Sequence, residues 1–334
     1  MTSSMLPLGD PELETQIAGE LDEIERRLVA AARTADALVS GPANHLLSAG
    51  GKRLRPVLVL LTSQFGSGVD DAVRQAAVAT ELTHLATLYH DDVMDSAPLR
   101  RGAPSAHEVW GNSVAILTGD LLFARASQLV SELGPVAVRI QADAFERLVL
   151  GQLHETIGPG PDEDPVAHYL GVLADKTGSL IAAAAHYGTL FAGAGPDVRA
   201  ATVAYAEKVG VAFQLADDVI DLASDAETTG KTPGTDLREG VPTMPVLLLR
   251  ARASAGTLDA EGVRLLADLD GDLSSDDDLA AVLARLRAHD VVDEARALAR
   301  SWSADAVAEL RGLPESSARS ALEAFAGLLV DRLA

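Results

Sequence analysis

Two short acidic motifs are the part of this sequence best suited to chemistry. Residues 91–95 read DDVMD and residues 217–221 read DDVID, and an apolar run precedes each of them. On a helix, residues four apart share a face, so the outer Asp residues of each motif present two carboxylates on one side while the middle Asp points elsewhere. Carboxylate oxygens suit Mg²⁺, whereas zinc favours His or Cys ligands. The motifs therefore predict a magnesium site that binds a polyanion.

A solvated acidic face is the simpler interpretation of either motif alone, because the whole chain is acidic. It has 27 Lys and Arg residues against 49 Asp and Glu residues, with a formal net charge of −22. A solvated helix face normally interleaves Lys and Arg with its acids, whereas both motifs follow hydrophobic stretches, at 85–89 and 211–216. Two such motifs together favour metal binding.

Basic residues near glycines indicate where phosphate groups would bind. The segment 50–56 reads GGKRLRP, and Arg100 and Arg101 follow the first acidic motif within two turns. Glycines allow backbone conformations that other residues rarely adopt, Lys supplies a point charge, and the planar guanidinium of Arg can donate two hydrogen bonds to phosphate oxygens. Lys176 and Lys231 also lie beside Gly or Thr, although an isolated lysine is more often simply solvated. The basic clusters suggest two separate diphosphates.

Composition excludes several classes of protein. A surface this acidic repels nucleic acid, and the absence of Cys excludes disulfides, thiolate nucleophiles and iron–sulfur clusters. No uninterrupted apolar run reaches the length of about 18 residues that predicts a transmembrane helix, and the first ten residues lack Lys and Arg, so they do not resemble a secretory signal. We expect a soluble, cytoplasmic protein without a nucleic-acid partner.

Helices must position these motifs, because the hydrophobic pattern is helical nearly throughout. Ile17, Leu21, Ile24 and Leu28 recur at spacings of three and four, strand patterns are almost absent, and aromatic residues make up only 4% of the chain. Pro and Gly mark short loops, and none of these segments resembles an interdomain linker. We predict a tail at 1–12 and one all-α domain at 13–334.

The ordered motifs resemble the trans-type isoprenyl diphosphate (polyprenyl) synthase family. The likeness runs from about Asn44 to Pro245, and its motifs are GGKRLRP, HDDVMD, LRRG, GQLHET, DKTGSL, FQLADDVIDL and GKTPGTDLREG. It implies an all-α bundle of many helices around a deep central cavity, usually as a homodimer. It also implies two Asp-rich motifs that face each other across the mouth of the cavity.

The resemblance assigns roles to the matching residues. Those expected to hold isopentenyl diphosphate are Lys52, Arg55, His84 and Arg101. Those expected to hold the allylic diphosphate are Arg100, Lys176, Thr177, Gln214 and Lys231. The expected Mg²⁺ ligands are Asp91, Asp95 and Asp217, supported by Asp92, Asp218 and Asp221, with about three ions when substrate is bound. Helical spacing agrees in part, because His84 stands seven residues before Asp91 and Gln214 seven before Asp221.

The family reaction needs no protein nucleophile. Metal ions and basic residues stabilise the leaving diphosphate, the allylic C–O bond ionises, and the double bond of isopentenyl diphosphate attacks the cation. Loss of a proton then gives an allylic diphosphate five carbons longer, and the resemblance suggests that the released diphosphate takes that proton. A lipid product would require transient contact with a membrane surface.

Small residues before the first motif predict a long product. Ala79, Thr83 and Ala86 form a stripe on that helix, and Ala86 stands where a Phe or Tyr blocks elongation in short-chain members of the family. We expect a product of about thirty carbons or more because small side chains leave room below the motif. Two alternatives stay open here: the stripe only permits close helix packing, or Phe123 or Phe145 floors the cavity of a farnesyl or geranylgeranyl diphosphate synthase.

Three other functions remain alternatives. A class I terpene cyclase shares the first motif but normally carries a different second metal motif. An HD-type phosphohydrolase would use His84, His90 and Asp91, yet it explains neither the basic segment 50–56 nor the second acidic motif. A non-catalytic subunit of a heteromeric synthase normally loses one or both acidic motifs, and here both are intact.

Overall fold

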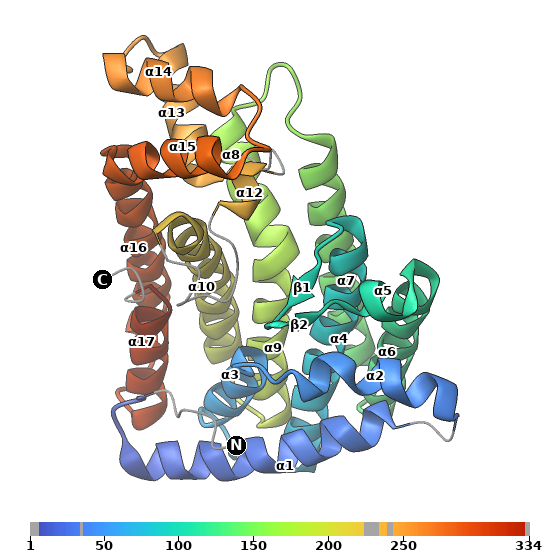
Figure 1. Cartoon of the computed structure of the whole chain (residues 1–334). Helices are drawn as coiled ribbons and strands as arrows, with labels where there is room; N and C mark the ends of the chain where they lie inside the picture. Colours follow the sequence, from blue (N-terminus) through green and yellow to red (C-terminus); the bar gives the residue numbers. More distant parts are fainter. Residues whose placement is uncertain (1–6, 34–35, 224–233, 239–242, 331–334) are drawn as a thin grey trace.

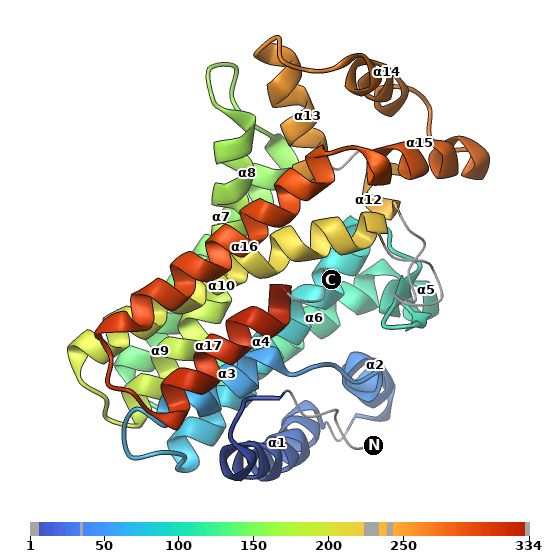
Figure 2. The same cartoon turned by 90° about the vertical axis from the view of Figure 1, so that its left-hand side faces the viewer.

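The protein is helical almost throughout, as the sequence predicts. The computed structural model describes residues 7–33, 36–223, 234–238 and 243–330, and within them the only sheet is a pair of two-residue strands. Long helices run side by side around a central α4, while α1 crosses one end of the bundle and α13, α14 and α15 cover the other (Figures 1 and 2). The all-α fold class is confirmed.

The first half of the chain contains the helices that surround α4. Its elements are α1 (Pro11–Ala32), α2 (Ala37–Ser48), α3 (Leu54–Ser63), α4 (Asp71–Met94), β1 (Leu99–Arg100), β2 (Ala103–Pro104), α5 (Ala106–Trp110), α6 (Asn112–Glu132) and α7 (Pro135–Ile157). The helix α1 begins at Pro11, and Leu8 before it is already buried. The division into a tail at 1–12 and one domain at 13–334 stays a prediction.

The second half supplies the opposite wall and the end of the bundle. Its elements are α8 (Pro165–Leu173), the π-helical turn η1 (Ala174–Gly178), α9 (Ser179–Phe191), α10 (Pro196–Ala223), α12 (Thr235–Arg238), α13 (Met244–Ser254), α14 (Ala260–Leu269), α15 (Asp276–Ala288), α16 (Val291–Glu309), the 3₁₀ turn η2 (Leu310–Gly312) and α17 (Ser317–Val330). One hydrophobic cluster joins α4 to its neighbours, and a second joins α10 to α13, α15 and α16.

The helix α4 is the scaffold of the bundle. Its 24 residues span about 36 Å, and the Asp70 carboxylate caps the N-terminus by accepting from the Val73 backbone N–H at 2.9 Å. Most of its middle residues are buried on all sides. It ends at Met94, with Asp91 in the last turn and Asp95 as the C-cap residue, so the fold brings the first acidic motif to one end of a rigid helix.

Small residues let neighbouring helices approach closely. A Cβ atom on Gly188 of α9 would lie 2.1 Å from Thr62 Oγ1 and 2.3 Å from the Val59 carbonyl oxygen of α3. No side chain fits at that distance, so the contact between α3 and α9 requires glycine. These two helices carry neighbouring parts of the site, the start of α3 and the start of α9.

The helices α6 and α7 carry most of the exposed large hydrophobic side chains that the structure describes. All but one of the exposed large hydrophobic residues in the described parts of the chain lie between Met94 and Ile157. Among those residues, α6 is also the only helix long and apolar enough to cross a membrane by length and composition, and one third of its apolar window is buried. It packs along α4, and core helices of soluble proteins meet the same criterion.

Candidate functional site

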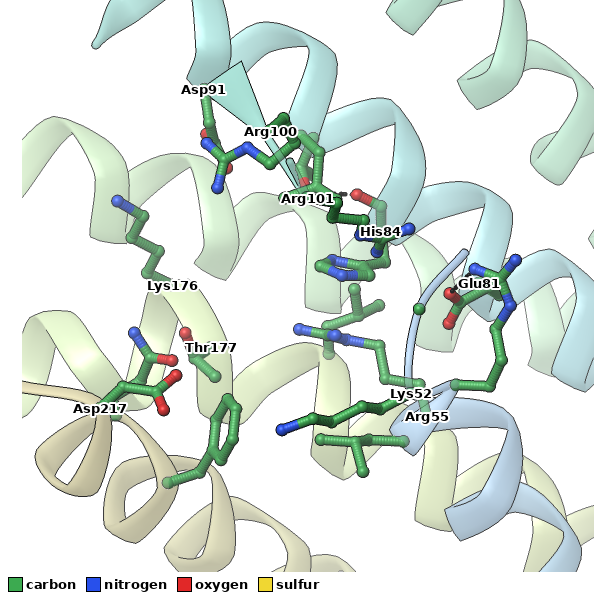
Figure 3. Close-up of a pocket in the computed structure, with 18 of the residues that line it drawn as sticks. Lys52, Arg55, Glu81, His84, Asp91, Arg100, Arg101, Lys176, Thr177 and Asp217 are labelled. Carbon is green, nitrogen blue, oxygen red and sulfur yellow. Dashed lines mark hydrogen bonds and ion pairs between the residues drawn. The ribbon is translucent and has the colours of Figure 1, made fainter. Parts of the chain in front are cut away.

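A cavity of about 700 Å³ lies between the start of α3, the cavity face of α4, the turn η1 and the helix α10 (Figure 3). Most of the residues predicted to bind substrate or metal line it, and they come from segments far apart in the sequence. The predicted residues in its wall are Lys52, Arg55, His84, Asp91, Arg100, Arg101, Lys176, Thr177, Gln214 and Asp217. The structure therefore brings together the two basic clusters and one Asp from each acidic motif.

The remaining predicted residues lie around this cavity or outside the described part of the chain. Asp92, Asp95 and Asp218 do not line the cavity, and neither does Asp221, which lies one turn beyond Asp217 on α10. Lys231 lies outside the described residues. Its assignment, like the roles of the other residues, stays a prediction.

Helical spacing explains which face of α4 meets the cavity. Glu81, His84, Leu88 and Asp91 recur at spacings of three and four, and all of them line the cavity. This face carries the polar groups, whereas the other faces of α4 pack against α3, α6 and α9. The first acidic motif and the histidine seven residues before it therefore open into one space.

Both acidic motifs lie at the C-terminal ends of helices. The helix α4 ends at Met94 and α10 ends at Ala223, and neither has a basic residue in its last turn. The C-terminal end of a helix dipole is negative, so carboxylates there are destabilised unless a cation lies nearby. The placement of both motifs thus favours bound cations.

The titration of the first motif supports the same conclusion. Burial raises the pKa of Asp91 to about 6, Lys176 opposes this shift, and Asp95 adds to it. Burial also raises the pKa of Asp95. A divalent cation between these carboxylates would favour their charged forms and remove the mutual repulsion.

The carboxylates do not by themselves form a complete metal cage. Within the described ranges, no group of three or more His, Cys, Asp or Glu side chains is placed to hold a metal ion. Mg²⁺ usually takes one or two protein carboxylates and completes its octahedron with waters and substrate phosphates. The residues present fit Mg²⁺ that is bound together with a diphosphate.

The middle Asp of each motif has a structural partner. Asp92 is fully buried and accepts a hydrogen bond from Arg100 Nε at 2.6 Å, which fixes Arg100 beside the cavity. Asp218 is buried and accepts from Tyr169 Oη at 2.9 Å and from the Met244 backbone N–H at 3.0 Å. Asp218 therefore joins α10 to α8 and α13. Asp91 and Asp217 line the cavity whereas Asp92 and Asp218 do not, as expected from their different faces on the helix.

The basic wall of the cavity is made by the loop before α3 together with α4 and β1. Figure 3 shows Lys52 and Arg55 extending into the cavity from one side, with His84 and Arg101 above them. Arg101 Nη1 donates to the carbonyl oxygens of Leu46, at 3.2 Å, and Gly50. Its guanidinium lies against Gly51, where an added Cβ would be 3.0 Å from Arg101 Cζ. A side chain at Gly51 would push the Arg101 guanidinium aside, and the φ of 155° there also favours glycine.

Burial sets the charge states on this wall. It lowers the pKa of Arg55 to about 10, so this guanidinium stays protonated at neutral pH. The pKa of His84 lies well below its usual range because the ring is buried and because Arg55 and Arg101 are close. A neutral imidazole among guanidinium groups can donate one N–H to a phosphate oxygen.

The opposite wall carries Lys176 and Thr177 in the π-helical turn η1, and Phe213, Gln214 and Asp217 on α10. A π-helical turn often marks a functional site because it changes the direction of side chains locally. Lys176 Nζ pairs with Glu155 Oε2 at 2.5 Å, and Figure 3 shows the lysine extending toward Asp91. This wall thus presents one cation close to the first acidic motif.

Sequence reasoning missed several residues of the site. Glu81 and Arg53 line the cavity, and so do the apolar side chains of Leu148, Leu180 and Phe213. A charged residue three positions before His84, within an otherwise apolar helix pattern, was a signal that could have identified Glu81. The partner of Lys176, Glu155, lies in the GQLHET motif.

The predicted chain-length residues are buried but do not line this cavity. Ala79, Thr83 and Ala86 are all buried, and the Ala86 carbonyl oxygen lies 3.1 Å from the position of a Cβ on Gly119 of α6. Their effect on product length stays a prediction. A second, apolar pocket of about 380 Å³ shares Thr87, Asp91 and Leu148 with the first.

The apolar pocket extends between α4, α6 and α7. Its wall includes Phe145, whose ring lies 4.0 Å from that of Phe123, centroid to centroid. Phe145 of α7 lines the pocket, whereas Phe123 of α6, its ring partner, does not. The space beside the first acidic motif is therefore mostly apolar, with one aromatic ring, Phe145, in its wall.

Comparison with known proteins agrees with this geometry. The family described as "Polyprenyl synthetase" matches residues 36–266. Nonaprenyl diphosphate synthase of Mycobacterium tuberculosis is 46% identical over 282 residues, which is 84% of this chain and 83% of that protein.

Two solved structures are similar over nearly the whole chain. A geranylgeranyl pyrophosphate synthase from Corynebacterium glutamicum, complexed with calcium and isoprenyl diphosphate, is 41% identical and superimposes with a TM-score of 0.85 over 97% of this chain and 98% of that one. A polyprenyl synthase from Caulobacter crescentus, also complexed with calcium and isoprenyl diphosphate, is 31% identical and superimposes with a TM-score of 0.87 over 100% and 99%. With its motifs, its fold and its cavity in agreement, the chain belongs to the polyprenyl synthetase family.

Proposed function

We propose that this protein is a Mg²⁺-dependent trans-prenyltransferase that condenses isopentenyl diphosphate with an allylic diphosphate. The observation that carries the proposal is a single cavity with a basic cluster on one wall and Asp91, Lys176 and Asp217 around the rest. Such a cavity has room and charge for two diphosphates. The relatives that carry prenyl diphosphate synthase names support the same activity.

The predicted residues divide between the two substrates and the metal. Lys52, Arg55, His84 and Arg101 bind isopentenyl diphosphate, and the residues assigned to the allylic diphosphate are Arg100, Lys176, Thr177, Gln214 and Lys231. Asp91, Asp95 and Asp217 hold Mg²⁺, about three ions in the substrate complex, with Asp92, Asp218 and Asp221 in support. When bound, the metal supplies charge that stabilises the leaving diphosphate. The calcium in the similar structures supports a divalent cation.

The side chains of the cavity favour ionisation followed by carbon–carbon bond formation. The allylic C–O bond breaks as the basic side chains stabilise the leaving diphosphate, and Leu88, Leu148, Leu180 and Phe213 keep water from the cation. The alkene of isopentenyl diphosphate, held on the opposite wall, forms the new bond. The released diphosphate then takes the proton, so no protein nucleophile is needed.

The product is about thirty carbons or longer, because an apolar pocket of about 380 Å³ adjoins the cavity beside Thr87 and Asp91. The resemblance, which places Ala86 where short-chain enzymes carry an aromatic block, favours the same length, although Ala86 itself lies against α6. The similarity to a nonaprenyl diphosphate synthase supports this length. A short-chain geranylgeranyl product is the second candidate, favoured by the ring pair Phe123 and Phe145 and by the Corynebacterium relative. A non-catalytic partner subunit is less favoured because both acidic motifs are intact.

We also propose that the protein is a cytoplasmic homodimer that contacts membranes transiently to release its product. The exposed apolar residues of α6 and α7 support an interface, because contiguous apolar surface of this kind marks association sites. Leu117 on α6 is 65% exposed. Replacing it with Glu should give monomers in sedimentation velocity, whereas Val263→Glu on α14, at a residue 57% exposed, should not. Unchanged dimers in the first variant would contradict this interface.

A product assay distinguishes the candidate functions. Purified protein is incubated with Mg²⁺, labelled isopentenyl diphosphate and, in parallel, geranyl, farnesyl or geranylgeranyl diphosphate, and the products are separated by chromatography. Chain extension that is lost in Asp91→Ala and kept in Asp277→Ala, an exposed acid on α15, supports the synthase. Cyclic hydrocarbons would identify a cyclase, simple hydrolysis a phosphohydrolase, and no reaction with any primer a missing partner subunit.

A further inference from the structure

A buried carboxylate lies beside the basic wall of the cavity and is not used by the reaction described above. Glu81 of α4 is 2% exposed and lines the cavity three residues before His84. The other acidic residues in the cavity wall, Asp91 and Asp217, belong to the two acidic motifs. Figure 3 shows Glu81 on the same side as Lys52 and Arg55, away from Lys176 and Asp217. A buried carboxylate is expensive unless it is paired, so Glu81 needs a reason for its position.

Its direct partner is Arg53, which connects three segments of the fold. Arg53 Nη1 lies 3.0 Å from Glu81 Oε1, while Nε and Nη2 each donate to the Glu25 carboxylate of α1 at 2.8 Å. Arg53 is 8% exposed, and its backbone is left-handed, with φ of 51°. Because Arg53 stands between Lys52 and Arg55 in the chain, this link fixes the loop that carries both phosphate-binding residues.

Glu81 also opposes the repulsion among the cations of this wall. The negative charge of Glu81 favours the protonated forms of Arg55 and Arg101, against burial and against their mutual repulsion. Several buried guanidinium groups without a nearby anion would move apart or draw water into the cavity. The carboxylate therefore maintains their arrangement before any diphosphate arrives.

We propose that Glu81 is a positioning residue that pre-organises the half-site for isopentenyl diphosphate, through Arg53 and through its charge on Arg55 and Arg101. The inference rests on the proposed function. The effect should fall mainly on one substrate, because Lys176, Thr177 and Gln214, which are assigned to the allylic diphosphate, lie on η1 and α10. Arg100, assigned to the same substrate, lies on β1 and is held by Asp92 rather than by Glu81. Lys176 has a carboxylate partner of its own, Glu155.

The test compares Glu81→Gln, which keeps the shape and removes the charge, with Glu315→Gln at an exposed position before α17. Binding of isopentenyl diphosphate alone is measured by calorimetry, and KM is measured for each substrate separately. The Glu81 variant should bind isopentenyl diphosphate roughly ten-fold more weakly and raise its KM by a similar factor, because pre-organisation is lost. The KM for the allylic diphosphate should change by less than about two-fold, and Glu81→Asp should recover part of the loss.

Two further measurements keep the test decisive. Arg53→Lys keeps the positive charge but loses the fork that joins Glu25 to Glu81, so it should shift the same KM in the same direction. Thermal melting of each variant shows that the chain is folded. Unchanged or tighter binding of isopentenyl diphosphate by Glu81→Gln would overturn the inference, as would an equal rise in both KM values. If the wild-type chain extends no primer, the proposed function fails, while calorimetry still tests Glu81.

Discussion

Replacing Asp218 with Ala should lower stability, whereas replacing its neighbour Asp217 should abolish activity without a comparable loss of stability. Both residues belong to the second acidic motif, yet they face different surroundings. Asp217 lines the cavity, while buried Asp218 accepts hydrogen bonds from Tyr169 Oη and from the Met244 backbone N–H. The contrast separates a residue proposed to bind ligand from one that holds three helices together.

The magnitude follows from those two hydrogen bonds. A hydrogen bond to a charged acceptor contributes about 1.5–3 kcal/mol, so the loss of both lowers the free energy of unfolding by about 3–6 kcal/mol. The entropy of unfolding for the 334 residues is about 0.7 kcal/mol/K, so Tm should fall by about 4–9 °C. In Asp217→Ala the fall in Tm should be smaller, because Asp217 is only partly buried and lines the cavity.

Circular dichroism melting of both variants and the wild type, without metal or substrate, provides the assay. The same preparations are then tested for chain extension at 25 °C, well below either melting transition. A wild-type Tm in Asp218→Ala, or an equal fall in Asp217→Ala, would refute the reasoning that the two carboxylates have different tasks.

Three other variants test separate parts of the structure. In the folded protein the pKa of His84 lies well below its ordinary value of 6.5. Below pH 6.5 the unfolded chain therefore binds a proton at His84 that the folded chain does not bind. The contribution of His84 to the free energy of unfolding is therefore present above pH 6.5 and is lost as the pH falls. His84→Gln should therefore lose less stability than the wild type between pH 8 and pH 5 in urea unfolding, and parallel curves would contradict the pKa shift. Gly188→Ala should lower the free energy of unfolding by about 3 kcal/mol, because the new Cβ would meet Thr62 and Val59. The control Gly171→Ala on α8 should not lose stability, because no atom lies within 4 Å of an added Cβ there. Thr87→Phe should shorten the products seen by chromatography, because Thr87 lines both the cavity and the adjoining apolar pocket. Ala86→Phe should mainly destabilise the fold, because Ala86 is fully buried. Products of wild-type length from Thr87→Phe would show that the prenyl product grows in another direction.

The sequence predicts the helical class and much of the site because both depend on local periodicity. His84 and Asp91 stand seven residues apart, so they share the cavity face of α4 in the structure as they do in the pattern. The same rule predicts that Asp92 points away from Asp91, and in the structure Asp91 lines the cavity whereas Asp92 does not.

Helical spacing does not predict which residues on different helices contact each other. The spacing of residues on α4 does not reveal that Arg53 reaches Glu25 on α1 and Glu81 on α4, nor that Asp218 bonds to α8 and α13. The small-residue stripe illustrates the same limit, because periodicity shows that Ala79, Thr83 and Ala86 lie together but not which helix they face. In the structure, Ala86 lies against α6.

The most direct test of the central claim is the mass of the products formed from farnesyl diphosphate and isopentenyl diphosphate with Mg²⁺. Wild-type protein should give allylic diphosphates whose masses rise by whole five-carbon units, and chelation of the metal or Asp91→Ala should abolish the series. Recovery of unextended farnesyl diphosphate, or of farnesol alone, from the wild-type protein with Mg²⁺ would contradict the account.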